Sequence, residues 1–392
     1  MRKATLKTLL CLPLLSLIPL YSNNSSGVEA CFELLEEEGF SDLDDLITLL
    51  DLQTASEQFH SYNQMQPANC DNFAYAEENI AERIRQIYTD HYFEQRVISC
   101  PDSKPWRIWV APFTEKVRQY GDELLYGYKE TFNGVTAAID YRKKDLWIFS
   151  AGFSYADANV SIAHTSTKAD LSTYAGTLGA CWSNTSYFAD MQFSFLYTPV
   201  HAQRKMVFET EEHPDEGRLH FRAKHYDRMN QVMGHLGAGF DFKVKAGTKA
   251  VVNIYPFGNV DYLYILQSGY KEKGAESLDL KVNGKQYDYL RPEGGLGIGY
   301  SRCVGRAQLT FDISAAYVLE FRLIGKETKA HFKKEDDCDF IVKGLNPENN
   351  LIAPEARLCL ASDGISFTLG YHGEFGDHFR ENAGEAELRI AF

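Results

Sequence analysis

From Trp106 to the C-terminus, apolar side chains recur at every second residue, and this feature restricts the possible folds more than any other. The segments 147–155, 187–197 and 309–317 alternate large apolar residues with small or polar ones. Successive side chains of a β-strand point to opposite faces, so this period indicates strands with one apolar face. The other face is mostly Gly, Ser, Thr, Asp and Gln, which suits a narrow hydrated lumen, or one plugged by a helix, better than bulk water.

Twelve such strands are expected, and the lengths of their connections follow a pattern. The strands fit residues 106–114, 128–141, 146–156, 171–182, 186–198, 229–243, 249–264, 285–300, 306–322, 350–361, 364–376 and 382–392. Connections after even-numbered strands are short, whereas those after odd-numbered strands are mostly long: 115–127, 157–170, 199–228, 265–284 and 323–349. Short turns alternating with long loops are typical of outer-membrane barrels. We therefore expect an all-β fold, a 12-stranded antiparallel transmembrane β-barrel, with a soluble sandwich as the minor alternative.

Charge and motifs exclude several other classes of protein. The chain has 54 acidic and 40 basic residues and a net charge of −14, whereas a nucleic-acid binder needs a basic face. No Gly-x-Ser-x-Gly, His-Glu-x-x-His or Walker-type sequence occurs, and no Cys/His spacing matches a zinc site. We therefore expect no enzyme activity, no cofactor, no metal and no nucleic-acid partner.

The first 30 residues have the features of a secretory signal peptide. A basic stretch at residues 2–7 precedes the apolar run Leu9–Leu20, which is too short to span a membrane. Cleavage after Ser22 and cleavage after Ala30 both fit the sequence. Export permits disulfides, and the mature chain keeps an odd number of cysteines: Cys31, Cys70, Cys100, Cys181, Cys303, Cys338 and Cys359. At least one thiol is then free or forms an intermolecular disulfide.

Residues 31–98 predict helices. Leucines recur at helical intervals up to Leu50, and a second helix fits Phe73–Phe93, which carries Arg83 and Arg85. The expected domains are thus a signal peptide (1–30), a helical pre-barrel or short passenger segment (31–105) and the barrel (106–392).

Several motifs of the barrel region resemble the β-domain of autotransporters, the type V secretion family. The similar segments are Gly134–Tyr141 with Leu146, Gly152 and Tyr155; Pro256–Tyr262; Arg291–Gly297; Tyr317–Phe321, in which Leu319 replaces the usual His; and the closing Leu388, Ile390 and Phe392. The segments 49–67 and 76–84 resemble the pre-barrel region of such proteins from chlamydia-like bacteria. The resemblance covers 287 of the 392 residues (392 − 105).

The resemblance implies a location and partners. It implies an outer-membrane barrel with the helix Phe73–Phe93 in its lumen, and a C-terminal signature (Leu388, Ile390, Phe392) that presents the chain to the barrel-assembly machinery. The protein would act as a translocator or membrane anchor in the outer-membrane lipid, with surface loops that contact host or surface ligands. The alternatives are a gated, porin-like pore and a barrel enzyme.

Lumen charges form the best-motivated site. The strand pattern directs Asp241, Glu293 and Glu320 inward, and Arg83 and Arg85 lie on the expected plug helix. An unpaired charge in a narrow pore is costly, so we expect these groups to form ion pairs. The alternative is that lumen water hydrates each charge separately.

Three further segments have simpler interpretations. An enzyme would use the histidines of the loop 199–228 (His201, His213, His220 and His225) with Asp215 or Asp227, but a solvated external loop is the preferred reading. Gly294–Gly299 lies within a strand, so it predicts close packing against a lumen helix rather than a phosphate loop. The acidic run Glu335–Asp339 around Cys338 predicts surface charge rather than a Ca²⁺ site.

Overall fold

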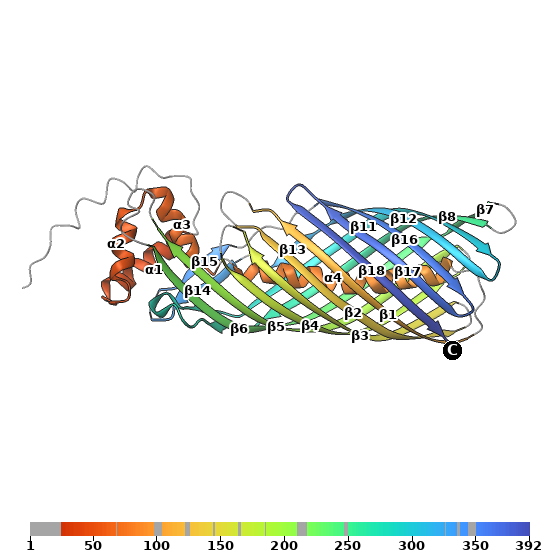
Figure 1. Cartoon of the computed structure of the whole chain (residues 1–392), viewed down its shortest axis with the longest axis horizontal. Coiled ribbons are helices and arrows are strands. Elements are labelled where there is room, and N and C mark those ends of the chain that lie inside the picture. Colours follow the sequence, from red (N-terminus) through yellow and green to blue (C-terminus); the bar gives the residue numbers. More distant parts are fainter. Residues whose placement is uncertain are drawn as a thin grey trace, which may run out of the picture.

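The computed structural model describes a long β-barrel with a helix inside it and a small helical unit at one end (Figure 1). The described residues are 25–67, 69–97, 104–121, 126–143, 146–163, 166–184, 186–209, 218–246, 250–325, 327–334, 338–343 and 350–392. The proposed signal peptide lies outside them except for residues 25–30. Of the helices in these ranges, none combines the length and apolar character needed to cross a membrane.

Twelve antiparallel strands close the barrel, as the alternation predicts. They are β1 (Trp106–Gln119), β2 (Tyr128–Lys143), β3 (Trp147–Ile162), β4 (Lys168–Ser183), β5 (Tyr187–Phe208), β6 (Leu219–Phe240), β8 (Ala250–Gln267), β11 (Lys285–Val304), β12 (Ala307–Leu319), β16 (Asn350–Ser362), β17 (Ile365–Phe375) and β18 (Phe379–Ala391). The short strands β7 (Phe242–Lys245) and β13 (Phe321–Ile324) continue β6 and β12. Because β18 pairs with β1 and β11 pairs with β8, the barrel sheet closes on itself.

The outer face of the barrel is apolar and open, as the alternating pattern predicts. Phe153, Leu178 and Leu236 are 54%, 63% and 65% exposed, whereas the residues that alternate with them are largely buried. Such a face would be costly in water, and in a bilayer it is the surface that contacts lipid. Trp106 and Tyr141 lie side by side near one end, with ring centroids 4.9 Å apart, as in an interfacial aromatic girdle.

Several strands continue beyond the lengths that the sequence predicts. The loop prediction for 199–228 is wrong at both ends, because β5 runs to Phe208 and β6 begins at Leu219. There the two strands pair from Tyr187↔Phe240 through to Phe208↔Leu219, although their outward residues become polar and charged. The contrast between apolar and polar faces, on which the strand prediction rests, disappears where a strand leaves the membrane.

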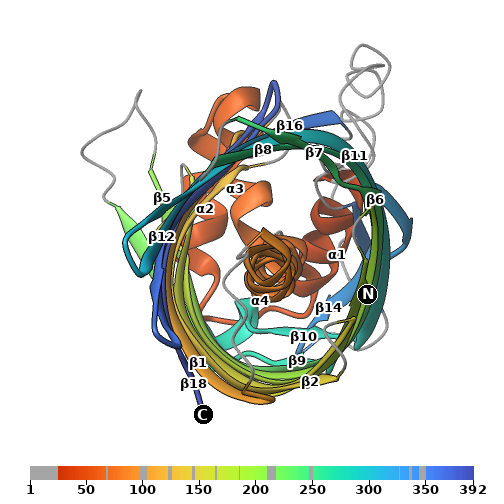
Figure 2. The ribbon, with the colours of Figure 1, turned by 90° about the vertical axis from the view of Figure 1, so that its right-hand side faces the viewer.

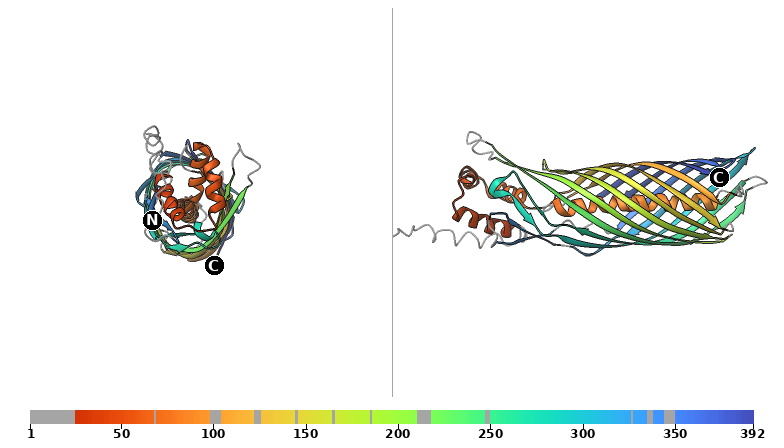
Figure 3. Two further views of the ribbon diagram at one scale, coloured as in Figure 1. Left: turned by 90° about the vertical axis from the view of Figure 1, so that its left-hand side faces the viewer. Right: turned by 90° about the horizontal axis from the view of Figure 1, so that it is seen from below.

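The first helical segment also differs from the prediction, because it contains three short helices. These are α1 (Ser25–Glu37), α2 (Asp44–Leu52) and α3 (Ala55–Met65), before the long α4 (Asn69–Val97). They lie at the end of the barrel opposite the C-terminus (Figures 1 and 3). A second sheet of β9 (Tyr270–Lys271), β10 (Leu280–Val282), β14 (Glu327–Phe332) and β15 (Phe340–Lys343) lies at the same end.

An apolar core of its own joins the three helices to this second sheet. Phe32 of α1 packs against Phe332 of β14 at 6.5 Å between ring centroids, and both side chains are buried. A disulfide links Cys31 of α1 to Cys338 between β14 and β15, with the two Cα atoms 5.4 Å apart. We call this unit of α1–α3 and β9, β10, β14 and β15 the cap. The long connections and the cap share one end, which we call the external end, and the short turns lie at the other, which we call the periplasmic end, because outer-membrane barrels have long external loops and short periplasmic turns.

Candidate functional site: the helix-filled lumen

The helix α4 lies along the axis of the barrel, as the view along that axis shows (Figure 2). It contains the whole predicted helix Phe73–Phe93 and is longer at both ends, from Asn69 to Val97. Almost every described side chain of α4 is buried, including Phe73, Ile80 and Ile84 on its apolar side. Since the helix is polar on its remaining faces, the strands around it must supply partners for those polar groups.

Small residues on the inner barrel face make room for the aromatic rings of α4. A Cβ added to Gly152 would collide with the hydroxyl of Tyr88, and one added to Gly179 would collide with the hydroxyl of Tyr92. Tyr88 also packs edge to face on Trp109, with ring centroids 5.1 Å apart. At these two positions the close approach of the helix explains the glycine, whereas Gly239 and Gly297 leave room for Phe188 and Tyr255 of neighbouring strands.

Arg83 is almost completely buried, and strand carboxylates surround it. Its Nη2 lies 2.8 Å from Glu385 Oε2 and its Nε lies 4.0 Å from Glu115 Oε2. A third contact, from Nη1 to Gln86 Oε1 at 2.8 Å, stays within the helix. Neither carboxylate is among the partners that the sequence pattern nominates.

Arg85 lies close to one of the expected carboxylates. Its nearest partner is Glu82 of its own helix at 3.0 Å, followed by Asp261 of β8 at 3.6 Å and Glu293 of β11 at 3.9 Å. The structure therefore brings Arg85 and Glu293 together, although the two closer partners belong to residues that the sequence analysis did not select.

The other two expected lumen acids have partners outside α4. Glu320 lies 3.8 Å from Arg291 of β11, which also pairs with Glu374. Asp241 is buried near the periplasmic end, where its Oδ1 accepts a hydrogen bond of 2.9 Å from Asn253. Neither acid contacts Arg83 or Arg85.

Two buried histidines each contact a pair of carboxylates, and sequence reasoning missed both. His91 of α4 lies between Asp140 of β2 at 2.6 Å and Glu387 of β18 at 2.8 Å, and its ring stacks on Trp109 at 4.4 Å. His235 of β6 lies between two strand carboxylates in the same way. The only sequence signal for His91 is its position on the helix eight residues after Arg83, two turns further along the same side.

Among the residues that the structure describes, one group in the lumen has the spacing of a cation site. The ligand atoms of His372, Glu374 and Glu381 all lie within 4.8 Å of one another. The guanidinium of Arg291 contacts Glu374 directly. The positive charge of Arg291 thus lies beside the position that a bound cation would occupy.

The residues proposed for a barrel enzyme do not form one site in the part of the chain that the structure describes. His201 and His220 point outward from β5 and β6, whereas His225 points inward and stacks on Tyr270 at 3.7 Å. Asp227 accepts a hydrogen bond from Gln267 at 2.7 Å. His213 and Asp215 lie outside the described residues.

The remaining predicted segments have clear positions. Leu388 and Ile390 point outward from β18 and are each 47% exposed, and the Phe392 backbone NH donates to Trp106 O at 3.0 Å. Gly294–Gly299 lies within β11, but its predicted packing against the lumen helix is wrong, because Cβ atoms added to Gly295 and Gly297 would meet Phe257 and Tyr255 of β8. Of the acidic run, residues 335–337 lie outside the described residues, and Asp339 pairs with Lys329 at 2.6 Å.

The structure describes the state of five of the seven cysteines of the predicted mature chain. Cys31 and Cys338 form a disulfide within the chain, and Cys181, Cys303 and Cys359 are free thiols. Cys303 is the most exposed of the three, near the turn that follows β11. The side chains of Cys70 and Cys100 lie outside the described part, and an intermolecular disulfide stays a prediction.

Solved structures with this fold are known. The translocator domain of the autotransporter NalP from Neisseria meningitidis superposes with a TM-score of 0.58 and 13% identity, over 83% of this chain and 99% of that one. The β-domain of the Bordetella autotransporter BrkA gives a TM-score of 0.50 and 14% identity, over 74% and 100%. These similarities establish the fold.

Sequence comparisons agree with the structural ones. The chain is 23% identical to outer membrane protein A of Rickettsia rickettsii over 186 residues, which is 46% of this chain and 8% of that protein. The Rickettsia conorii counterpart gives 22% identity over 186 residues. The chain thus spans less than a tenth of the length of these curated relatives. The chlamydia-type detail of the predicted resemblance receives no support from these matches.

The family model described as "Autotransporter beta-domain" matches residues 108–372. This stretch covers most of the barrel, from β1 to β17, and contains the four internal barrel motifs of the resemblance, but not the closing Leu388, Ile390 and Phe392. The protein is therefore a β-barrel of the outer membrane, and the chain belongs to the autotransporter beta-domain family.

Proposed function

We propose that this translocator barrel carries its own N-terminal helices to the cell surface and displays them there as the cap. One observation carries the proposal. The helix α4 passes through the lumen with its first residue at the external end and its last near the periplasmic end, where β1 begins (Figure 1). A chain with this path has its preceding segment, α1–α3, on the external side.

The contacts of α1–α3 support display rather than release. Arg204 of β5 donates to Gln64 O in α3 at 3.0 Å and pairs with Glu272 of the cap. Gln64 also accepts from the Val207 backbone NH at 2.7 Å. Together with the Cys31–Cys338 disulfide, these bonds hold the helices on the external extensions of β5 and β6. The short passenger segment is then a fixed part of the protein surface.

The same arrangement gives the lumen helix a second role, which is to keep the pore closed. The side chains of α4 fill the lumen, and ion pairs such as Arg83–Glu385 fix them to the wall. In the described part of the chain, the lumen charges named above are buried and paired with one another, which favours a structural role over chemistry on a substrate. We infer a non-catalytic role, with the barrel-assembly machinery and outer-membrane lipid as partners and surface ligands meeting the cap.

The residue range of the cap also bears on the domain boundaries. The helix α1 begins at Ser25, and Val28 is fully buried in the core of the cap. Removing residues up to Ser22 leaves α1 whole, whereas removing those up to Ala30 deletes its first turns. We therefore propose that signal cleavage follows Ser22.

Surface labelling of two matched insertions tests the display proposal. Gly39, in the turn after α1, and Gly305, in the turn between β11 and β12, both have a positive φ and open space around the Cβ position. A short epitope placed after Gly39 should be labelled by antibody on intact cells. The same epitope after Gly305 should be labelled only once the outer membrane is permeabilised.

Folding of both variants is checked by heat-modifiable gel mobility, because folded barrels resist SDS until heated. If the Gly39 epitope were labelled only after permeabilisation in a folded barrel, the cap would be periplasmic and the display proposal would be wrong. If both epitopes were labelled on intact cells, the assigned orientation would be wrong.

A further inference from the structure

A row of like charges crosses three neighbouring strands at the external end of the barrel. Arg118 of β1 is directly opposite Arg380 of β18 on one side and Lys129 of β2 on the other. All three side chains are exposed and occupy the outward positions of their strands. Opposite residues of antiparallel strands lie roughly 4.5–5.5 Å apart, so three positive charges are held close together.

Like charges directly opposite one another destabilise a sheet, and this chain is otherwise acidic, with a net charge of −14. The ring of Tyr120 offsets part of the repulsion, because the Arg118 and Arg380 guanidinium carbons lie 4.6 and 5.8 Å from its centroid. Within the described ranges, no carboxylate forms an ion pair with any of the three cations. The row is therefore a concentrated positive surface without a protein counter-charge in those ranges.

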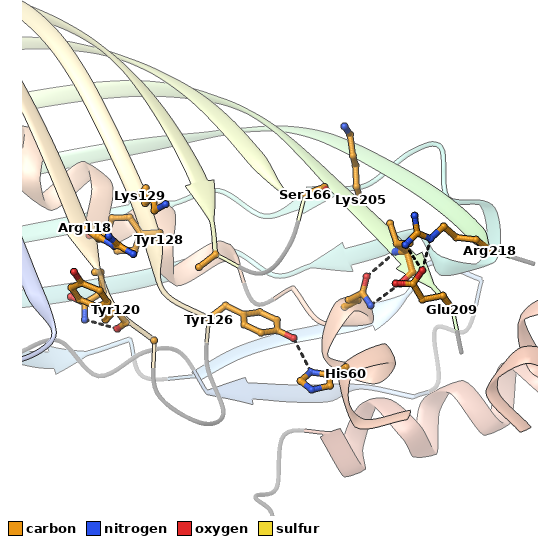
Figure 4. Close-up of a pocket in the computed structure, with 15 residues that line it drawn as sticks. His60, Arg118, Tyr120, Tyr126, Tyr128, Lys129, Ser166, Lys205, Glu209 and Arg218 are labelled. Carbon is orange, nitrogen blue, oxygen red and sulfur yellow. Dashed lines mark hydrogen bonds and ion pairs between the residues drawn. The ribbon is translucent and has the colours of Figure 1, made fainter. Parts of the chain in front are cut away.

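A cavity borders this row and adds further cations. Its volume is about 860 Å³, and it lies between the external ends of β1, β2 and β5 and the helix α3 (Figure 4). Arg118 and Lys129 line one side of it, and Lys205 and Arg218 line another. Glu209, the one acid among the described residues that line the cavity, is paired with Arg218. Tyr120 and Tyr126, which are half-buried, supply flat polar-edged surfaces of the kind that pack on sugar rings, whereas Tyr128 is buried.

The height of the row on the barrel indicates which part of the membrane it meets. On β1 the outward residues are apolar from Trp106 to Pro112 and become polar at Thr114. Arg118 is 12 residues beyond Trp106, which is about 40 Å along the strand and about 28 Å along the barrel axis at a tilt of about 45°. The apolar band of an outer-membrane barrel is about 25 Å tall, so Arg118 lies just beyond its external edge. This is the level of the charged lipid headgroups of the outer leaflet.

We propose that the row Arg118, Lys129 and Arg380, with the cavity beside it, binds the phosphorylated oligosaccharide headgroup of a lipid in the outer leaflet. Arginine guanidinium groups bind phosphate oxygens in a bidentate manner, and lysine adds a point charge. Phosphate between the three cations replaces their mutual repulsion with attraction. The row lies on the outer wall, and the cavity beside it extends inward as far as the buried Tyr128, whose hydroxyl accepts a hydrogen bond from Asn79 of α4.

Binding to the purified, folded, full-length protein in dodecyl maltoside tests this proposal. The probe is rough-type lipopolysaccharide, which carries phosphates on its sugars, and it is compared with the same lipid after enzymatic dephosphorylation. The variant Arg118→Gln/Lys129→Gln/Arg380→Gln should bind the phosphorylated lipid about a hundredfold more weakly, since each basic residue near a charged lipid surface contributes about fivefold. The matched control Lys143→Gln/Lys243→Gln/Arg306→Gln removes three exposed cations at the periplasmic end and should bind like the wild type.

A second measurement separates lost binding from lost structure. Without lipid, the midpoint of heat unfolding should be equal or higher in the external triple variant than in the wild type, because the repulsion is gone. Adding the phosphorylated lipid should raise the midpoint of the wild type and of the control variant, but not that of the external triple variant. If the triple variant does not fold, Arg118→Gln alone should weaken binding about fivefold.

Three outcomes would overturn the proposal. The first is equal binding of the lipid by the wild type and the external triple variant. The second is equal binding of the phosphorylated and dephosphorylated lipids by the wild type. The third is a midpoint shift with inorganic pyrophosphate at the same concentration that matches the shift with the lipid, which would assign the site to a soluble phosphate.

Discussion

Replacing Arg83 by methionine should destabilise the folded barrel more than any change on its outer surface. The side chain of Arg83 is 1% exposed, and those of Glu385 and Glu115 are 5% and 0% exposed. Methionine keeps most of the volume but leaves two buried carboxylates facing each other without a cation. Removing one partner of a buried ion pair costs about 3–5 kcal/mol, and we expect a loss in that range.

The assay is urea unfolding in detergent, followed by tryptophan fluorescence and by gel mobility. Trp109 is a local reporter, because its indole lies 4.4 Å from the His91 ring and 5.1 Å from the Tyr88 ring of α4. The control Arg302→Met removes an exposed arginine from the periplasmic end of β11 and should change stability by less than about 0.5 kcal/mol.

A double-mutant cycle identifies the cause of the loss. Adding Glu385→Gln to Arg83→Met removes one of the two stranded charges, so the double variant should be more stable than the sum of the single effects by about 1–3 kcal/mol. If the two effects simply add, or if Arg83→Met costs less than about 1 kcal/mol, then lumen water rather than the ion pair compensates these charges, and our reasoning is wrong.

Three further predictions follow from other contacts. Gly152→Val should push Tyr88 and α4 aside and produce ion conductance in planar bilayers, whereas Gly176→Val, with open space around its Cβ position, should leave the pore closed. Burial opposes ionisation of Asp42, but hydrogen bonds from Ser277 and the charge of Lys334 lower its pKa below the ordinary 3.8. The contribution of Asp42 to cap stability is therefore present above pH 3.8 and is lost as the pH falls further. Protease release of α1–α3 should show this acid dependence in the wild type but not in Asp42→Asn. Mass spectrometry of the mature protein should find Asn23 at its N-terminus, and a start at Cys31 would contradict the proposed cleavage.

The barrel could be predicted from the sequence because lipid imposes a simple rule on it. Inside the bilayer the outward residues are apolar, so strands such as β3 alternate regularly between apolar and small or polar residues. This alternation shows which residues face the lipid and which face the lumen. Above the bilayer both faces meet water or the cap, and the rule no longer holds. The external halves of β5 and β6 were therefore expected to be loops, although they pair as regularly as the rest.

The sequence predicts which types of residue form the lumen site, but not which of them pair with each other. The pattern identifies inward carboxylates and a helix with two arginines, but the pairing depends on the rotation and depth of α4 within the barrel. Arg83 and Glu385 are 302 residues apart, and nothing local in the sequence links them. The disulfide has the same property, since cysteine spacing alone leaves the pairing open.

The disulfide between Cys31 and Cys338 has a topological consequence. It joins two points of the cap that are 307 residues apart, one before α4 and one between β14 and β15. The backbone between them, closed by the disulfide, forms a covalent ring that includes α4 in the lumen and most strands of the barrel. While the bond is intact, α4 cannot slide back toward the periplasm, because the cap would have to follow it through the lumen. Oxidation of the Cys31 and Cys338 thiols at the cell surface would thus make the passage of these helices through the lumen irreversible.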